Sequence, residues 1–203
     1  MANSSAHAVS LSGHIESQTA TGIPNGKLGM WVFLASEVMF FTGLIGAYVV
    51  LRLSNPAWPG SEGHLKVWIG TINTLILICS STTIVMALAA SERHATPSLR
   101  RWLLATILLG SLFLVIKGFE YHDKFSHHVF ISTNIFWACY FTLTGFHAVH
   151  VFGGIVFNLI VLSWTARPSV WNVLRHRLEY AGLYWHFVDI VWIFLFPMLY
   201  LFK

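Results

Sequence analysis

The chain alternates between long apolar runs and short polar connections. A helix needs about 20 apolar residues to cross the hydrocarbon core of a bilayer, and five runs reach that length. The pattern therefore predicts an all-α protein, an integral membrane bundle of five transmembrane helices. The predicted spans are residues 28–53, 66–90, 101–120, 130–164 and 178–202.

The residues outside these spans predict how the chain is organised. Residues 1–27 are polar and lack the apolar core of a signal peptide, so we expect a flexible cytoplasmic N-terminal arm before a five-helix membrane domain at 28–203. Helix-breaking residues such as Gly and Pro mark three connections, at 55–60, 91–97 and 167–168. Residues 121–128 are predicted as a connection from their charged residues and histidines. The fourth span exceeds what a bilayer needs, so it should tilt or project.

Composition supports a membrane location. The chain is 56% hydrophobic and only 10% charged, against about 25% charged residues in soluble domains. Disorder is excluded, because it needs low hydrophobicity and high charge. The net charge of +4 is spread between apolar runs, so no nucleic-acid partner is expected. Cys79 and Cys139 lie inside apolar runs and are too few for a disulfide or zinc framework.

The distribution of Lys and Arg predicts an orientation. Cytoplasmic segments carry an excess of these residues. If the spans alternate, one side holds seven of them: Lys27, Arg93, Arg100, Arg101, Arg167, Arg175 and Arg177. The other side holds five: Arg52, Lys66, Lys117, Lys124 and Lys203. This favours a cytoplasmic N-terminus and a C-terminus outside.

Ionisable residues inside spans cost roughly 2.5–3.5 kcal/mol on insertion scales, so each requires an explanation. Glu37 lies near the middle of the first span, where desolvation disfavours a charged carboxyl. Glu37 has two interpretations. It is part of a proton relay or a ligand site, or it is a neutral carboxylic acid that hydrogen-bonds to a neighbouring helix. Lys117, Glu120 and Lys124 share a face of the third span, and we interpret them as a self-compensating charge cluster at the outer interface.

The last two spans each carry a polar stripe. That of the fourth span consists of Tyr140, Thr144, His147, His150, Gly154 and Asn158. That of the fifth span consists of Glu179, Gly182, His186 and Asp189. The stripes predict interhelical hydrogen bonds in a polar seam, typically worth about 0.6 kcal/mol each.

A metal site is the alternative interpretation of these stripes, and it requires His147 and His150 to be joined by His186 and Asp189. One i, i+3 His pair cannot bind both faces of a haem, and no Glu-x-x-His pairs of a carboxylate-bridged dimetal bundle occur. We therefore expect no metal and no catalytic residue in this chain.

Small residues and one proline predict details of packing. We expect Pro197 to kink or end the last helix. Close approach of helix backbones is expected at Gly43, Ala47, Gly70, Gly110, Gly153 and Gly154.

Four segments together resemble a known family. They are 29–43 (GMWVFLASEVMFFTG), 118–121 (GFEY), 141–151 (FTLTGFHAVHV) and 184–194 (YWHFVDIVWIF). In this order and on these spans they are similar to subunit III of haem–copper terminal oxidases, the cytochrome c oxidase subunit 3 family, in a short five-span bacterial form. The resemblance covers nearly all of the chain from residue 28.

The resemblance implies a non-catalytic core subunit of a proton-pumping respiratory oxidase in the bacterial plasma membrane. Its partners would be the catalytic subunit I, subunit II, membrane lipids and, in some complexes, a larger respiratory supercomplex. Haems and copper would lie in the partner subunits, and bound phospholipids are expected. Glu37 matches the family's buried, carbodiimide-reactive carboxyl. His147, His150, His186 and Asp189 match positions that tie the bundle together, and Glu120 belongs to the same seam.

The resemblance leaves alternatives open. The long form of the family has seven spans, so the lipid-filled cleft made by its first two would need helices from a partner. Ser36-Glu37 and Phe40-Phe41 favour a cytochrome c oxidase over a quinol oxidase. One alternative is a haem- or quinone-binding electron-transfer protein that uses the His pairs. Another is a secondary transporter with Glu37 as its proton site. Such transporters usually show internal repeats, and we find no convincing repeat.

Overall fold

The computed structural model describes residues 25–60, 65–166 and 171–201. This part of the chain forms five long helices and one π-helical turn. They are α1 (Asn25–Ser54), α2 (Val67–Glu92), α3 (Thr96–Ser126), α4 (Ile135–Trp164), α5 (Trp171–Phe196) and η2 (Pro197–Leu201). All five long helices have the length and hydropathy to span a membrane. The predicted all-α bundle of five transmembrane helices is confirmed.

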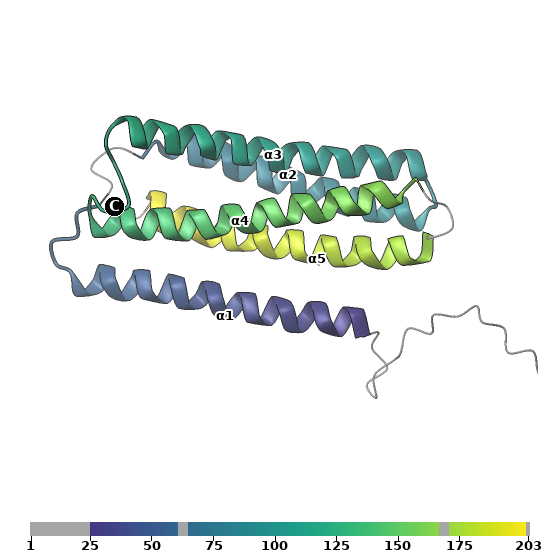
Figure 1. Ribbon diagram of the computed structural model, residues 1–203, viewed down its shortest axis with the longest axis horizontal. Coiled ribbons are helices and arrows are strands. Elements are labelled where there is room, and N and C mark those ends of the chain that lie inside the picture. Colours follow the sequence, from purple (N-terminus) through teal and green to yellow (C-terminus); the bar gives the residue numbers. More distant parts are fainter. Residues whose placement is uncertain (1–24, 61–64, 167–170, 202–203) are drawn as a thin grey trace, which may run out of the picture.

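The helices run roughly parallel or antiparallel to one another, with α2, α3, α4 and α5 forming a bundle and α1 lying along one side of it (Figure 1). α1 packs against α5 and α4. Only Leu34, Phe41 and Tyr48 of α1 are buried. They are spaced by seven residues, so they form a single narrow stripe on the helix. Met30, Leu44 and Ile45 flank this stripe and are partly buried against the core.

The core of the bundle is rich in aromatic side chains. Trp137, Trp185 and Trp192 are each at most 1% exposed. Because lipid is as apolar as these side chains, close packing and hydrogen bonds rather than hydrophobicity hold membrane helices together. The tryptophans therefore stabilise the bundle through the contacts they make.

Glycines make room for two of these contacts. A Cβ at Gly110 would lie 2.5 Å from the Trp185 ring, and a Cβ at Gly154 would lie 2.8 Å from it. Gly70 similarly admits the rings of Phe196 and Tyr200. The prediction of close approach is confirmed at these three glycines. It is wrong at Gly43, where an added Cβ would meet nothing within 4 Å.

The helix ends differ from the predicted spans most at α3. This helix begins at Thr96, with Pro97 in its first turn, where the missing proline N–H leaves no helical bond unmade. It continues to Ser126, so the predicted connection at 121–128 is wrong for its first six residues. That segment holds neither Gly nor Pro, and its charged residues are compatible with a helix. The turn comes later, where His128 adopts a φ of 57°.

The remaining ends also shift. α4 starts at Ile135 rather than at 130, because the side chain of Asn134 accepts a hydrogen bond from Trp137 N at 2.9 Å and caps the helix. α5 starts at Trp171, seven residues before the predicted span. α1 starts at Asn25, so residues 25–27 are helical and not part of the predicted arm. The rest of that arm, residues 1–24, lies outside the described residues.

Pro197 interrupts α5 as predicted. The helix ends at Phe196 and the chain continues as η2. Proline has no N–H to donate and its ring clashes with the preceding turn, so regular helix cannot continue through it. The π-helical turn buries Leu199 and Tyr200. This change of register brings the Tyr200 hydroxyl to the polar groups of α3 and α4.

Candidate functional site: an interhelical polar seam

The residues that the sequence singled out lie in the bundle but do not converge on one point. Glu37 pairs with His150 between α1 and α4. His186 and Asp189 of α5 meet Ser81 of α2. Glu120 lies in a separate cluster at the end of α3. We call these groups, together with His147, the polar seam.

The pair between Glu37 and His150 joins the outlying helix to the bundle. Glu37 Oε2 lies 2.8 Å from His150 Nε2, and the two side chains are 19% and 15% exposed. The rings of Phe40 and Phe41 both lie against the imidazole. Tyr184 donates from its hydroxyl to the backbone oxygen of His150 at 3.1 Å, which ties α5 to the same point. Three helices therefore meet at this pair.

The hydrogen-bond partners of His150 fix how many protons the pair holds. His150 Nδ1 lies 2.8 Å from Phe146 O. A carbonyl oxygen only accepts, so Nδ1 carries the hydrogen and Nε2 of a neutral ring can only accept. The contact with Glu37 then requires one proton between the two groups, on the carboxyl or on the imidazole. Glu37 and His150 therefore form a hydrogen-bonded pair between α1 and α4.

The Ser81 cluster links α2 to α5. The Ser81 hydroxyl donates to Asp189 Oδ2 at 2.6 Å and lies 2.8 Å from His186 Nδ1. A hydroxyl has one hydrogen, so His186 Nδ1 acts as the donor to Ser81 Oγ. Asp189 Oδ1 is buried and has no hydrogen-bond partner among the described residues. One serine of α2 therefore bonds to both His186 and Asp189 of α5.

His147 is the most deeply buried member of the seam. It is 0% exposed, and its Nε2 donates to Val188 O of α5 at 3.1 Å. Its ring packs between Phe113 and Trp192. His147 and His150 are thus bonded to different helices, α5 and α1. The structure does not bring these two histidines to a common ligand.

Glu120 belongs to a buried ionic cluster. Lys117 Nζ lies 2.9 Å from Glu120 Oε2 and donates to the hydroxyls of Tyr200 and Tyr140 at 2.6 and 3.3 Å. Tyr200 donates to Glu120 Oε1 at 2.7 Å. The side chains of Lys117 and Glu120 are 5% and 3% exposed. Lys117 and Glu120 thus compensate each other, and Lys124, 2% exposed, lies near Asp123. Their place at the outer membrane interface stays a prediction.

The metal-site alternative does not fit this geometry. Among residues 25–60, 65–166 and 171–201, no three His, Cys, Asp or Glu side chains are grouped so that they could hold a metal ion. His147, His150, His186 and Asp189 instead bond to Val188, Glu37 and Ser81.

The sequence interpretation missed two members of the seam. Ser81 lies in a run of four hydroxyl residues, 80–83, inside an apolar span, and that run is a signal that could have identified it. Tyr200 follows Pro197, and no periodic pattern could have placed it, because the π-helical turn changes the register of the last residues.

Comparisons with known proteins agree on one family. A family model described as cytochrome c oxidase subunit III matches residues 5–203. The chain is 37% identical over 200 residues to cytochrome c oxidase subunit 3 of Thermostichus vulcanus, covering 94% of this chain and 98% of that protein. It is 37% identical over 177 residues to the protein of the same name from Corynebacterium diphtheriae, covering 86% of each. It is 38% identical over 176 residues to the protein of the same name from Synechocystis, and the alignment covers 85% of this chain and 74% of that protein.

Proposed function

The chain belongs to the cytochrome c oxidase subunit III family, and from this premise we propose that it is a non-catalytic core subunit of a proton-pumping respiratory terminal oxidase. The observation that carries the proposal is the match over nearly the whole chain. The geometry supports it, because the ionisable residues of the seam bond to other helices of this chain. Haems and copper belong to partner subunits, and this chain stabilises the catalytic subunit.

The identity of the copurifying proteins tests this role. A tag on the N-terminus of this chain should recover, from mild-detergent extracts of native membranes, a haem–copper catalytic subunit I and a subunit II, both identified by mass spectrometry. An untagged strain controls for unspecific capture. Recovery of the chain without any haem–copper partner would contradict the proposal.

Cytochrome c is the proposed electron donor, since the relatives from Thermostichus vulcanus, Corynebacterium diphtheriae and Synechocystis are named cytochrome c oxidase subunits. A subunit III of a quinol oxidase is the second candidate. Subunit II of the purified complex distinguishes them: a dicopper site in that subunit indicates cytochrome c, and its absence indicates a quinol.

Glu37 and His150 form the proposed proton-handling element of this subunit. The pair holds one proton at a contact of 2.8 Å and lies 15–19% exposed at the side of the bundle. A proton that can sit on either partner can be delivered toward the proton-uptake route of the catalytic subunit. The same contact ties α1 to α4, so the pair combines a proton-related and a structural role.

Two substitutions separate these roles. Glu37→Gln keeps a hydrogen-bond donor, its side-chain amide, for His150 Nε2 but removes the titratable carboxyl. The complex should therefore assemble and reduce oxygen at close to the wild-type rate, with proton uptake slowed. Glu37→Ala removes both the hydrogen-bonding group and the carboxyl, and it should also weaken the packing of α1 against α4. Oxygen consumption and proton uptake by the purified complex in vesicles are the measurements. Total loss of oxygen reduction in an assembled Glu37→Gln complex would contradict this assignment.

The proposed setting is the bacterial plasma membrane, with the N-terminus cytoplasmic, the C-terminus outside, and phospholipids bound along the chain. Seven Lys and Arg residues on the N-terminal side against five on the other support this orientation. Reporter fusions to each terminus test it: a C-terminal alkaline phosphatase should be active, and a C-terminal cytoplasmic reporter should not.

A further inference from the structure

His186 presents a polar atom on the lateral surface of the bundle. Its side chain is only partly buried between α2 and α5. Nδ1 lies 2.8 Å from Ser81 Oγ, whereas Nε2 has no partner among the described residues. The described side-chain atoms that are fully enclosed and lack a partner do not include Nε2, so this nitrogen reaches the surface.

The hydrogen bonds of Ser81 determine what this nitrogen does. The Ser81 hydroxyl donates its one hydrogen to Asp189 Oδ2 at 2.6 Å, so His186 Nδ1 carries the hydrogen of its contact with Ser81. A neutral imidazole with its hydrogen on Nδ1 has a lone pair on Nε2. This lone pair requires a hydrogen-bond donor that the described part of the chain does not supply.

The depth of His186 in the membrane excludes the usual sources of a donor. Ser81 is at least 11 residues from either end of α2, and His186 is at least 10 residues from either end of α5. At a helical rise of about 1.5 Å per residue this is roughly 15 Å, half of a hydrocarbon core about 30 Å thick. Water and lipid headgroups do not reach this depth. Acyl chains have no donor, so lipid alone leaves Nε2 unsatisfied.

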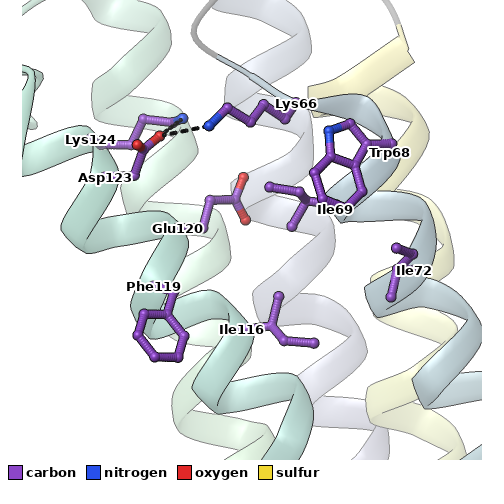
Figure 2. Close-up of a pocket in the computed structure, with 9 residues that line it drawn as sticks. All are labelled: Lys66, Trp68, Ile69, Ile72, Ile116, Phe119, Glu120, Asp123 and Lys124. Carbon is purple, nitrogen blue, oxygen red and sulfur yellow. Dashed lines mark hydrogen bonds and ion pairs between the residues drawn. The ribbon is translucent and has the colours of Figure 1, made fainter.

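The polar groups where α2 begins and α3 ends have no such need. Figure 2 shows the ion pairs of Lys66 and Lys124 with Asp123, and the two Nζ atoms lie 3.7 and 3.4 Å from Asp123 Oδ2. These residues are also at helix ends, close to the headgroups. His186 differs in both respects, because it lies at mid-span and one of its nitrogens is unpaired.

The surroundings of His186 suit a transmembrane helix. Ile190, one turn further along α5, is 52% exposed, and Ile78, one turn before Ser81 on α2, is 46% exposed. We call Ile78, Ser81, His186 and Ile190 the α2–α5 face. It combines apolar surface with one unsatisfied acceptor, and polar side chains of this kind hydrogen-bond across helices in membranes.

A second copy of this chain does not complete the α2–α5 face. In a two-fold symmetric contact the same face would meet itself. The isoleucine side chains have no donor, the hydrogen of Ser81 is already given to Asp189, and Nε2 of His186 is an acceptor on both copies. The donor must therefore come from a different protein.

We infer that a transmembrane helix of another oxidase subunit packs over the α2–α5 face, and that its hydroxyl, amide or indole group donates a hydrogen bond to His186 Nε2. The inference rests on the proposed role as an oxidase subunit. It adds which face of the chain meets a partner and which chemical group that partner brings. The face lies between α2 and α5, apart from the pair of Glu37 and His150 between α1 and α4.

Photocrosslinking of the intact complex tests the inference. p-Benzoylphenylalanine replaces Ile78 or Ile190 in the tagged chain, and the purified complex is irradiated. From both positions, mass spectrometry should find adducts with one transmembrane helix of another oxidase subunit. Adducts with lipid alone, or with different proteins from the two positions, would overturn the inference. Copurification of the haem–copper subunit is scored separately, so an assembled complex without these adducts overturns the assignment of this face and not the proposed function.

Release of the chain by detergent tests the role of the imidazole. At the detergent concentration that releases half of the wild-type chain, His186→Phe should raise the ratio of released to assembled chain about threefold, the factor for one interhelical hydrogen bond in a membrane. His186→Gln should stay close to wild type, because its amide both donates and accepts. An unchanged ratio for His186→Phe would overturn the inference.

Ser81→Ala is the matched control. It removes the hydrogen bonds within the chain but leaves the imidazole at the surface, so its ratio should stay close to wild type. A ratio for Ser81→Ala equal to that for His186→Phe would show that His186 acts only within the bundle, and would also overturn the inference.

Discussion

At the scale of single residues, the position of Trp185 shows how tightly the bundle is packed. Its ring lies between Gly110 of α3 and Gly154 of α4, and its indole N–H donates to Ser80 Oγ of α2 at 2.9 Å. One side chain thus contacts three other helices. The two glycines are needed for close approach at this crossing, and any larger residue must displace the indole.

Gly154→Ala tests this packing. Its Cβ would lie 2.8 Å from the Trp185 ring, and such overpacking costs about 1–3 kcal/mol. Gly118→Ala is the matched control, because its Cβ meets no heavy atom within 4 Å and alanine favours helix by up to about 1 kcal/mol. Thermal unfolding of the purified complex should show a lower Tm for Gly154→Ala than for Gly118→Ala. Equal Tm values would mean that the contact between Gly154 and the Trp185 ring is not tightly packed.

The buried pair of Lys117 and Glu120 leads to a second prediction. Lys117→Met leaves Glu120 buried without its cation, which costs about 3–5 kcal/mol. The double variant Lys117→Met/Glu120→Gln removes both charges and should be more stable than Lys117→Met alone. Lys66→Met is the control, because the exposed pair with Asp123 is worth at most about 1 kcal/mol. A Tm of Lys117→Met equal to that of Lys66→Met would contradict the assignment.

At the scale of elements, α1 is the helix least integrated into the bundle. Its buried residues form the single stripe of Leu34, Phe41 and Tyr48. Polar contacts along its length supplement that stripe. Lys27 pairs with Glu179, Glu37 pairs with His150, and the Tyr48 hydroxyl donates to Met198 O in η2 at 3.1 Å. These contacts fix the position of α1 along its axis relative to α4, α5 and η2.

Tyr48→Phe should loosen one end of this helix. It removes the hydrogen bond to Met198 O, and interhelical bonds of this kind are worth about 0.6 kcal/mol in membranes, or roughly a threefold change in local opening. Amide hydrogen exchange at the C-terminal end of α1 and in η2 should accelerate by about that factor. Tyr121→Phe, which removes a hydroxyl that bonds Thr144 between α3 and α4, should leave both segments unchanged. Unchanged exchange in Tyr48→Phe would show that the contact does not hold α1.

The ends of α3 show where element prediction from sequence stops. Hydropathy identifies the apolar centre of a helix well, but α3 extends beyond it by five residues at one end and six at the other. Those extra turns are polar and carry Asp123 and Lys124. Their low hydropathy is also typical of a loop. Both ends of α3 also contact other segments: Arg100 donates to Thr165 after α4, and Asp123 pairs with Lys66 before α2. A single-sequence pattern does not contain those contacts.

At the scale of the whole molecule, the sequence predicted the five-span architecture and the family, because apolar run length and four ordered motifs are local properties. Helical periodicity identified the histidines and Asp189 of the polar seam, because it shows which side chains share a face, but Ser81 and Tyr200 were missed. It did not predict that His150 meets Glu37 or that Ser81 bonds to His186 and Asp189. Those pairings depend on how neighbouring helices are aligned, which periodicity along one helix does not determine.

We propose that this chain supports an oxidase without carrying its redox centres. The most direct measurement is the optical spectrum of the complex purified through a tag on this chain, followed by the spectrum of the same chain after it is separated from its partners. The complex should show a Soret band of haem, and the separated chain should show none. A Soret band that stays with the separated chain, or a purified complex without haem, would contradict the account.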